Sequence, residues 1–147
     1  MAAIRHSNDL INRLPKVRGQ LTQNVELAKL TWFRVGGPAE VLYRPADEAD
    51  LIKFLKGLPT EIPVTILGVG SNILVRDGGI PGVSIRLGSG FHHISICGKT
   101  VTVGAGTPNL KLANAAREEA LAGMEFLCGI PGTLGGSIRM NSGAYNS

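Results

Sequence analysis

Short runs of apolar residues recur along the chain, some continuous and some alternating with polar residues. In the first half they predict strands at residues 30–35, 40–44 and 64–67. The run at 64–67 is continuous, which is typical of a buried strand. From residue 82 onward the runs shorten and predict an antiparallel meander, with strands at 83–87, 94–96 and 100–103.

Helical spacing of apolar residues predicts three helices, the first over residues 4–14. Asp47 is expected to cap the second, whose first turn is acidic and whose last turn is basic. Thr107 and Pro108 open the third as N-cap and first helical residue, and Gly123 ends it. The inner faces of these last two helices are expected to carry Leu51, Phe54, Leu55 and Leu58, and Leu110, Ala113, Ala116 or Arg117, and Ala120 or Leu121.

A strand, the helix after Asp47 and the strand at 64–67 form a β-α-β crossover with parallel strands. In such units ligands bind beyond the carboxyl ends of the strands, where a glycine-rich turn follows here. Glycines let consecutive backbone amides converge on an anion, and short polar side chains add donors. We therefore predict a cradle for the pyrophosphate of a nucleotide cofactor, formed by Gly68, Val69, Gly70, Ser71 and Asn72.

The alternative for this stretch is a tight turn in which the glycines serve geometry alone. The cradle hypothesis predicts that Gly70→Val abolishes cofactor retention while the fold stays intact. Two standard nucleotide loops are excluded. The dinucleotide fingerprint needs a glycine where Ile73 stands, and the mononucleotide loop needs one where His93 stands, before Gly98-Lys99-Thr100. That tripeptide is instead expected to form a hairpin turn.

The composition narrows the function further. The 147 residues carry a net charge of +4 and include 20 glycines, which suits a protein that handles anionic small molecules. Aromatic residues make up 5% and no basic stripe is present, so we expect no nucleic-acid partner. Cys97 and Cys128 are too few for a disulfide framework and indicate reduced thiols in the cytoplasm. No apolar run is long enough to cross a membrane.

Histidines offer no metal site, because His92 and His93 would leave a strand on opposite faces. The last third of the chain mixes glycines with apolar residues, which fits backbone lying against a planar ligand. A tightly packed helix start at 132–137 is the alternative. Gly104-Ala105-Gly106, directly before the third helix, is a candidate for a second anion contact, with a structural turn as its alternative.

Four motifs occur in order: TWFRVGGPA at 31–39, LGVGSNILV at 67–75, GIPGTLGG at 129–136 and MNSGAY at 140–145. Together they resemble the UDP-N-acetylenolpyruvoylglucosamine reductase family, flavoenzymes that complete UDP-N-acetylmuramate for bacterial peptidoglycan. The resemblance covers nearly the whole chain. A broader likeness to vanillyl-alcohol-type oxidases involves only residues 68–72 and 129–136.

The resemblance implies an α+β fold, a two-lobed FAD-binding module with a β-α-β lobe and an antiparallel-sheet lobe with helices. We expect an N-terminal helical segment at 1–22, lobe 1 at 23–87 and a truncated lobe 2 at 88–147, without the substrate-binding domain. By family likeness the pyrophosphate lies at Gly68–Asn72. The flavin and the rest of FAD are expected to contact Gly129, Ile130, Pro131, Gly132, Thr133, Gly136, Ser137, Asn141, Gly143 and Ala144.

In the family, NADPH reduces noncovalently bound FAD, which passes hydride to the enolpyruvyl group of a UDP-sugar while an enzyme acid protonates the other carbon. The resemblance thus implies a cytoplasmic oxidoreductase, and we expect a monomer with no membrane partner. The family's catalytic Arg, Ser and Glu belong to motifs beyond residue 147, so no catalytic residue is assigned here. The chain alone is expected to be inactive, and whether it binds FAD unaided stays open.

Two other functions remain open at the level of sequence. One is a vanillyl-alcohol-type flavin oxidase, in which His92, His93 or Cys128 could link FAD covalently. The other is a non-catalytic fragment that binds nucleotide or serves only as a folding unit.

Overall fold

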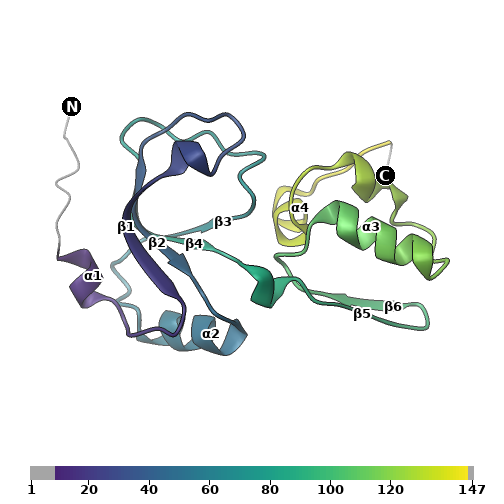
Figure 1. Ribbon diagram of the computed structural model, residues 1–147, viewed down its shortest axis with the longest axis horizontal. Coiled ribbons are helices and arrows are strands. Elements are labelled where there is room, and N and C mark those ends of the chain that lie inside the picture. The colour runs from purple at the N-terminus through teal and green to yellow at the C-terminus, as the bar shows by residue number, and fades with distance from the viewer. Residues whose placement is uncertain (1–8, 146–147) are drawn as a thin grey trace. The chain divides into compact units, whose positions relative to one another are not determined.

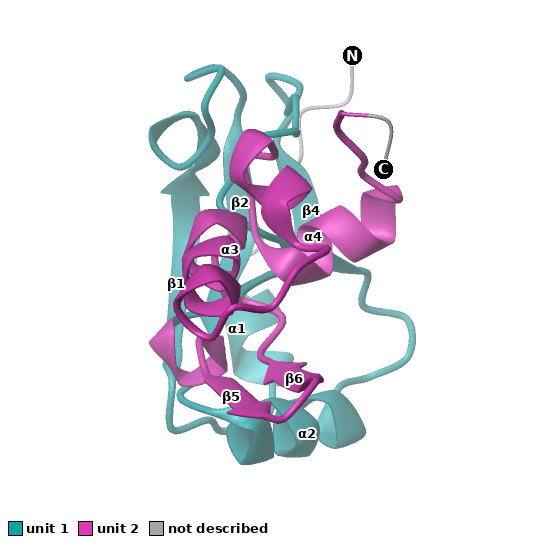
Figure 2. Cartoon of the chain, turned by 90° about the vertical axis from the view of Figure 1, so that its right-hand side faces the viewer, with its two compact units in different colours: residues 1–88 teal, residues 89–147 magenta. Residues whose placement is uncertain are grey.

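The computed structural model describes residues 9–145, and the chain divides into two compact units, residues 1–88 and 89–147 (Figures 1 and 2). Unit 1 contains a four-stranded sheet in the order β1-β2-β4-β3, and unit 2 contains the two-stranded sheet β5-β6. The strands are β1 (Gln20–Glu26), β2 (Pro38–Arg44), β3 (Val64–Leu67), β4 (Ile80–Arg86), β5 (Ile94–Cys97) and β6 (Thr100–Val103). The predicted α+β class is confirmed.

Helices complete both units. The α-helices are α1 (Leu10–Arg13) and α2 (Glu48–Gly57) in unit 1, and α3 (Asn109–Glu118) and α4 (Leu134–Met140) in unit 2. Short 3-10 turns are η1 (Leu27–Lys29), η2 (Ser89–Phe91) and η3 (Glu125–Gly129). The part of the predicted helix 4–14 that precedes residue 9 lies outside the described residues. None of the helices in residues 9–145 is long and apolar enough to cross a membrane.

The β-α-β unit forms as predicted, with one addition. Strand β4 pairs in parallel with both β2 and β3, so the crossover from β2 through α2 to β3 skips the central position. Asp47 caps α2, since its side chain accepts a hydrogen bond from the Asp50 amide at 2.9 Å. The prediction that 64–67 is a buried strand was wrong: β3 is an edge strand in which Ile66 is 60% exposed.

Unit 1 contains one strand that was not predicted and lacks one that was. Strand β1 was not predicted, because its alternating residues are half-buried at best and include few apolar side chains. It pairs antiparallel with β2, and the predicted boundary at residue 22 falls inside it. Residues 30–35 form turns instead of a strand, and their apolar side chains Trp32, Phe33 and Val35 are exposed.

The sheet of unit 1 separates two apolar clusters. On one face α2 packs against the sheet through Phe54, whose ring centroid lies 4.3 Å from that of Tyr43. The buried members of this cluster are Leu10, Leu14, Val41, Tyr43, Phe54, Ile62, Val83 and Ile85. The loops that follow β1 and β3 cover the other face, where Leu27, Ala39, Leu42, Leu67 and Val75 are buried. Strands β2 and β4 are therefore buried on both faces, as is typical of parallel strands.

The predicted three-stranded meander was wrong. The run at 83–87 contributes β4, which joins the parallel sheet of unit 1, and only β5 and β6 pair antiparallel. Gly98-Lys99-Thr100 does form the predicted hairpin turn, since Cys97 pairs with Thr100 and Gly98 has φ +58°.

Helix α3 begins one residue later than predicted, with Pro108 as its N-cap, and its inner face differs from the expected one. Leu112 and Ala116 are buried, whereas Leu110 is 56% exposed. Arg117 and Ala120 are also exposed, so of the expected set Ala116 is the buried member.

Candidate functional site

The glycine loop, residues 68–72, follows the last residue of β3. Leu67 pairs with Arg86, so the loop starts where β3 and the central strand β4 both end. This is the carboxyl edge of the parallel strands, where the β-α-β argument placed it. Gly68 and Asn72 are exposed, and Val69, Gly70 and Ser71 are half-buried.

An anion site needs backbone N–H groups that have no other backbone acceptor, and the glycine loop has such groups. Across residues 9–145, the amides of Val69, Gly70 and Asn72 donate no hydrogen bond to another backbone carbonyl. Gly70 has φ +77°, a conformation that brings neighbouring amides toward one side of the chain. The residues present therefore fit a phosphate group at this loop.

Gly70 itself is required by its protein neighbours. A Cβ at this position would overlap the Leu30 carbonyl oxygen and lie 3.0 Å from the Thr31 Cα. The Gly70 carbonyl also accepts a hydrogen bond from the Trp32 amide at 2.9 Å. The expectation that Gly70→Val leaves the fold intact was wrong, because the added side chain meets backbone.

The loop at residues 30–38 holds the segment that follows β3 through glycine contacts. A Cβ at Gly36 would lie 2.6 Å from that of Val75, and one at Gly37 would overlap the Asp77 carbonyl. The Gly37 amide donates to the Arg76 carbonyl at 2.9 Å. The motif at 31–39 therefore supports the glycine loop by close backbone packing, which requires glycine at these positions.

The second predicted set lies in unit 2, around the start of α4. The Leu134 amide donates to the Thr107 carbonyl and the Gly135 amide to the Ala105 carbonyl, both at 2.9 Å. A Cβ at Gly135 would lie 2.9 Å from the Ala105 Cβ. Residues 132–137 are thus closely packed at the helix start, with Gly132 at φ +135°, and their predicted contact with the flavin stays a prediction.

Asn109 holds this helix start and was not singled out in the sequence. Its side chain is 1% exposed, and its Nδ2 donates to the Ile130 carbonyl at 3.0 Å and to the Ser137 Oγ at 2.6 Å. Within the described chain, its Oδ1 is buried without a hydrogen-bond partner. The only signal was an amide residue directly after Thr107-Pro108, which is common at helix starts.

The remaining predicted contacts lie along residues 129–144. Gly129 is exposed beside Tyr145, whose hydroxyl would lie 2.6 Å from a Cβ at the glycine. Asn141 ends α4 in the left-handed conformation at φ +48°, which asparagine tolerates better than most residues. The others range from buried (Thr133, Ser137) through half-buried (Ile130, Gly132, Ala144) to exposed (Pro131, Gly136, Gly143).

Ser137 and Asn141 also border an open hollow of about 560 Å³ within unit 2. Apolar side chains from β6, α3 and η3 form most of its wall, among them Val101, Leu112 and Phe126. The structure thus places the predicted pyrophosphate contacts, residues 68–72, in unit 1. It places the other predicted FAD contacts, between residues 129 and 144, in unit 2. Across residues 9–145, no three His, Cys, Asp or Glu side chains are grouped as metal ligands.

Comparison with known proteins identifies the family. Residues 39–147 match the family described as FAD binding domain. UDP-N-acetylenolpyruvoylglucosamine reductase of Azorhizobium caulinodans is 60% identical over 132 residues, covering 90% of this chain and 43% of the relative. The protein of the same name in Parvibaculum lavamentivorans is 57% identical over 145 residues, covering 99% and 47%.

A solved structure agrees in fold. The crystal structure of UDP-N-acetylenolpyruvylglucosamine reductase from Thermus caldophilus matches with a TM-score of 0.69 at 36% identity, covering 88% of this chain and 44% of that one. The chain spans less than half the length of the curated relatives it matches. With 39–147 matched in sequence and the fold matched in a solved structure, the chain belongs to the FAD-binding domain family.

Proposed function

We propose that this chain provides the cofactor-binding part of an NADPH-dependent reductase that converts UDP-N-acetylenolpyruvoylglucosamine to UDP-N-acetylmuramate. The observation that carries the proposal is the glycine loop at the carboxyl edge of the parallel strands, where the amides of Val69, Gly70 and Asn72 donate to no backbone carbonyl of residues 9–145. Relatives at 57% and 60% identity, named for this reductase, support the choice of substrate.

Each part of the chain has a distinct task in this function. The amides of residues 68–72 hold the FAD pyrophosphate, and residues 129–137, Asn141, Gly143 and Ala144 contact the rest of the cofactor. Bound FAD supplies hydride transfer from NADPH to the enolpyruvyl double bond. Gly36, Gly37 and Asn109 keep the two segments in place by packing and hydrogen bonding, and none of them reacts.

The reductase works on a soluble UDP-sugar in the cytoplasm, as a monomer that binds neither nucleic acid nor membrane. The free thiols Cys97 and Cys128 support a reducing compartment. The acid that protonates the substrate and the groups that bind the UDP-sugar are not assigned to residues of this chain.

The test uses the protein from the complete reading frame that encodes this chain. Loss of NADPH absorbance should require UDP-N-acetylenolpyruvoylglucosamine and should match formation of UDP-N-acetylmuramate mole for mole. UDP-N-acetylglucosamine, which lacks the enolpyruvyl group, is the control substrate and should consume no NADPH. A flavin-loaded protein that oxidises NADPH equally fast with either sugar would overturn the proposed function.

A further inference from the structure

Arg86 is the last residue of β4 and lies beside the glycine loop. Its strand neighbour Ile85 belongs to the cluster under α2, so alternation places the Arg86 side chain on the opposite face, toward the loops. There it borders a small cavity of about 10 Å³ together with Gly68, Gly70 and Thr31. Arg86 is half-buried at this position.

A second arginine ends the adjacent strand. Tyr43 pairs with Ile85, which sets Arg44 at the end of β2 next to Arg86 at the end of β4. Neither arginine forms an ion pair with a carboxylate in the part of the chain that the structure describes. Burial and the nearby Arg44 charge both lower the pKa of Arg86. Two neighbouring cations are therefore left uncompensated at the edge of the sheet where the glycine loop begins.

Ser84 places a further polar side chain on the face of β4 that carries Arg86. It lies two residues before Arg86, so its side chain is on the same side of β4. The residue is fully buried, and its Oγ lacks a hydrogen-bond partner among residues 9–145. A surface built only for apolar packing would place an apolar residue here, since a buried unpaired hydroxyl lowers stability.

The simplest alternative is that the Arg86 stem covers Leu27 and Leu30 while its charge stays in water. That role needs no cation, and it leaves the like-charged pair with Arg44 unexplained. A bound anion accounts for both, because a phosphate group attracts two guanidinium groups and accepts bidentate hydrogen bonds from one of them.

We propose that the Arg86 guanidinium, with Arg44 beside it, contacts a phosphate of the FAD pyrophosphate held by the glycine loop. This inference rests on the proposed function, because it takes FAD as the ligand. It assigns the loop a charged side-chain partner in addition to its backbone amides.

The test measures dissociation constants of the complete apoprotein for FAD and for riboflavin, which lacks phosphate, by quenching of flavin fluorescence. Arg86→Gln should weaken FAD binding by about 10- to 100-fold, the usual effect of losing a charge-assisted hydrogen bond, and leave riboflavin binding unchanged. The FAD affinity of Arg86→Lys should lie between those of the wild type and Arg86→Gln. Lysine keeps the positive charge but cannot donate the bidentate hydrogen bonds of a guanidinium group. Arg117→Gln, at an exposed arginine of α3, is the matched control and should change neither constant.

The dependence of FAD affinity on salt concentration is a second measurement. A purely structural role of Arg86 would not change this dependence. Affinity of the wild type for FAD should fall more steeply with added KCl than that of Arg86→Gln. If the glutamine variant does not fold, Arg86→Lys decides: unchanged FAD affinity overturns the inference. Equal losses for FAD and riboflavin would also overturn it. If the wild type binds FAD and Arg86→Gln binds equally well, the inference fails while the proposed function stands; a wild type that binds no FAD removes both.

Discussion

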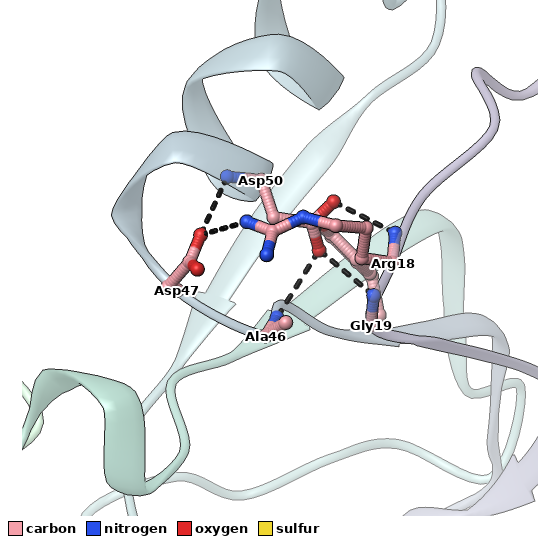
Figure 3. Close-up of polar contacts among 6 residues, drawn as sticks. Arg18, Gly19, Ala46, Asp47 and Asp50 are labelled. Carbon is pink, nitrogen blue, oxygen red and sulfur yellow. Dashed lines mark hydrogen bonds and ion pairs between the residues drawn. The ribbon is translucent and has the colours of Figure 1, made fainter.

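Asp50 is the clearest case in which one residue organises its surroundings. Its carboxylate accepts hydrogen bonds from the amides of Arg18, Gly19 and Ala46, at 2.8 to 3.1 Å (Figure 3). It also accepts one from the Tyr43 hydroxyl at 2.8 Å. Burial alone would raise the pKa of Asp50, but these hydrogen bonds outweigh it and hold the pKa well below its usual range. The same carboxylate ties the segment before β1 to the start of α2.

Asp50→Asn should lower the free energy of unfolding at pH 7 by about 2–4 kcal/mol, because three amides and a hydroxyl lose a charged acceptor. The folded-state pKa lies below the unfolded value of about 3.9, so the wild type keeps this stabilisation above about pH 5 and loses it as the pH falls below about 4. Urea denaturation at several pH values measures both effects.

The variant should therefore lack this part of the acid dependence, and the gap between the two proteins should narrow toward low pH. Glu48→Gln, an exposed carboxylate in the same helix turn, is the control and should leave stability nearly unchanged. An equally stable Asp50→Asn at pH 7 would contradict the role assigned to the carboxylate.

Gly70→Ala should destabilise the protein by at least about 2 kcal/mol, since φ +77° disfavours a side chain and the Cβ would overlap the Leu30 carbonyl. Gly78→Ala is the matched control, because nothing lies within 4 Å of a Cβ there. Its stability should stay within about 0.5 kcal/mol of the wild type. Thermal unfolding of the two variants compares them directly, and equal melting temperatures would contradict the packing described for Gly70.

At the scale of elements, α3 shows what periodicity can and cannot determine. The helix and its start were predictable from Thr107, Pro108 and the spacing of apolar residues, but the predicted end at Gly123 was wrong, because the helix ends at Glu118. Its buried face was not, because Leu110 and Leu112 both suit a helix interior and the sequence does not say which side meets η3 and β6. In the structure Leu112 is 2% exposed, whereas Leu110 is 56% exposed.

Leu112→Ala should cost about 2–5 kcal/mol of stability, because it opens a cavity in the interior of unit 2. Leu110→Ala removes the same atoms from an exposed position and should cost less than about 0.5 kcal/mol. Chemical denaturation of both variants gives the comparison. The reverse order of stabilities would support the face predicted from the sequence.

Strand prediction failed where apolar residues are exposed and where a mostly polar segment forms a strand. Residues 30–35 carry Leu30, Trp32, Phe33 and Val35, yet three of these side chains are exposed in a loop. Strand β1 is mostly polar and still pairs with β2, because hydrogen bonding to a central strand needs little apolar surface at the edge. Which sheet β4 joins depends on a long-range pairing that local patterns do not contain.

At the scale of the whole molecule, the glycine loop was predictable because glycine spacing and β-α-β topology point to the same edge of the sheet. The supporting residues were harder to find. Gly36, Gly37 and Asn109 act through contacts with residues distant in the chain, and Arg86 stands out only once the end of β4 is placed beside residue 68. Contacts of this kind become visible only in three dimensions.

The flavin content of the folded protein tests the central claim most directly. We expect the complete protein, purified without added cofactor, to carry a stoichiometric amount of FAD that is released entirely into solution on denaturation. Gly78→Ala should retain FAD to the same extent. A folded protein that binds no FAD at saturating cofactor would contradict the claim that the amides of residues 68–72 hold its pyrophosphate, and flavin left on the denatured polypeptide would contradict noncovalent binding.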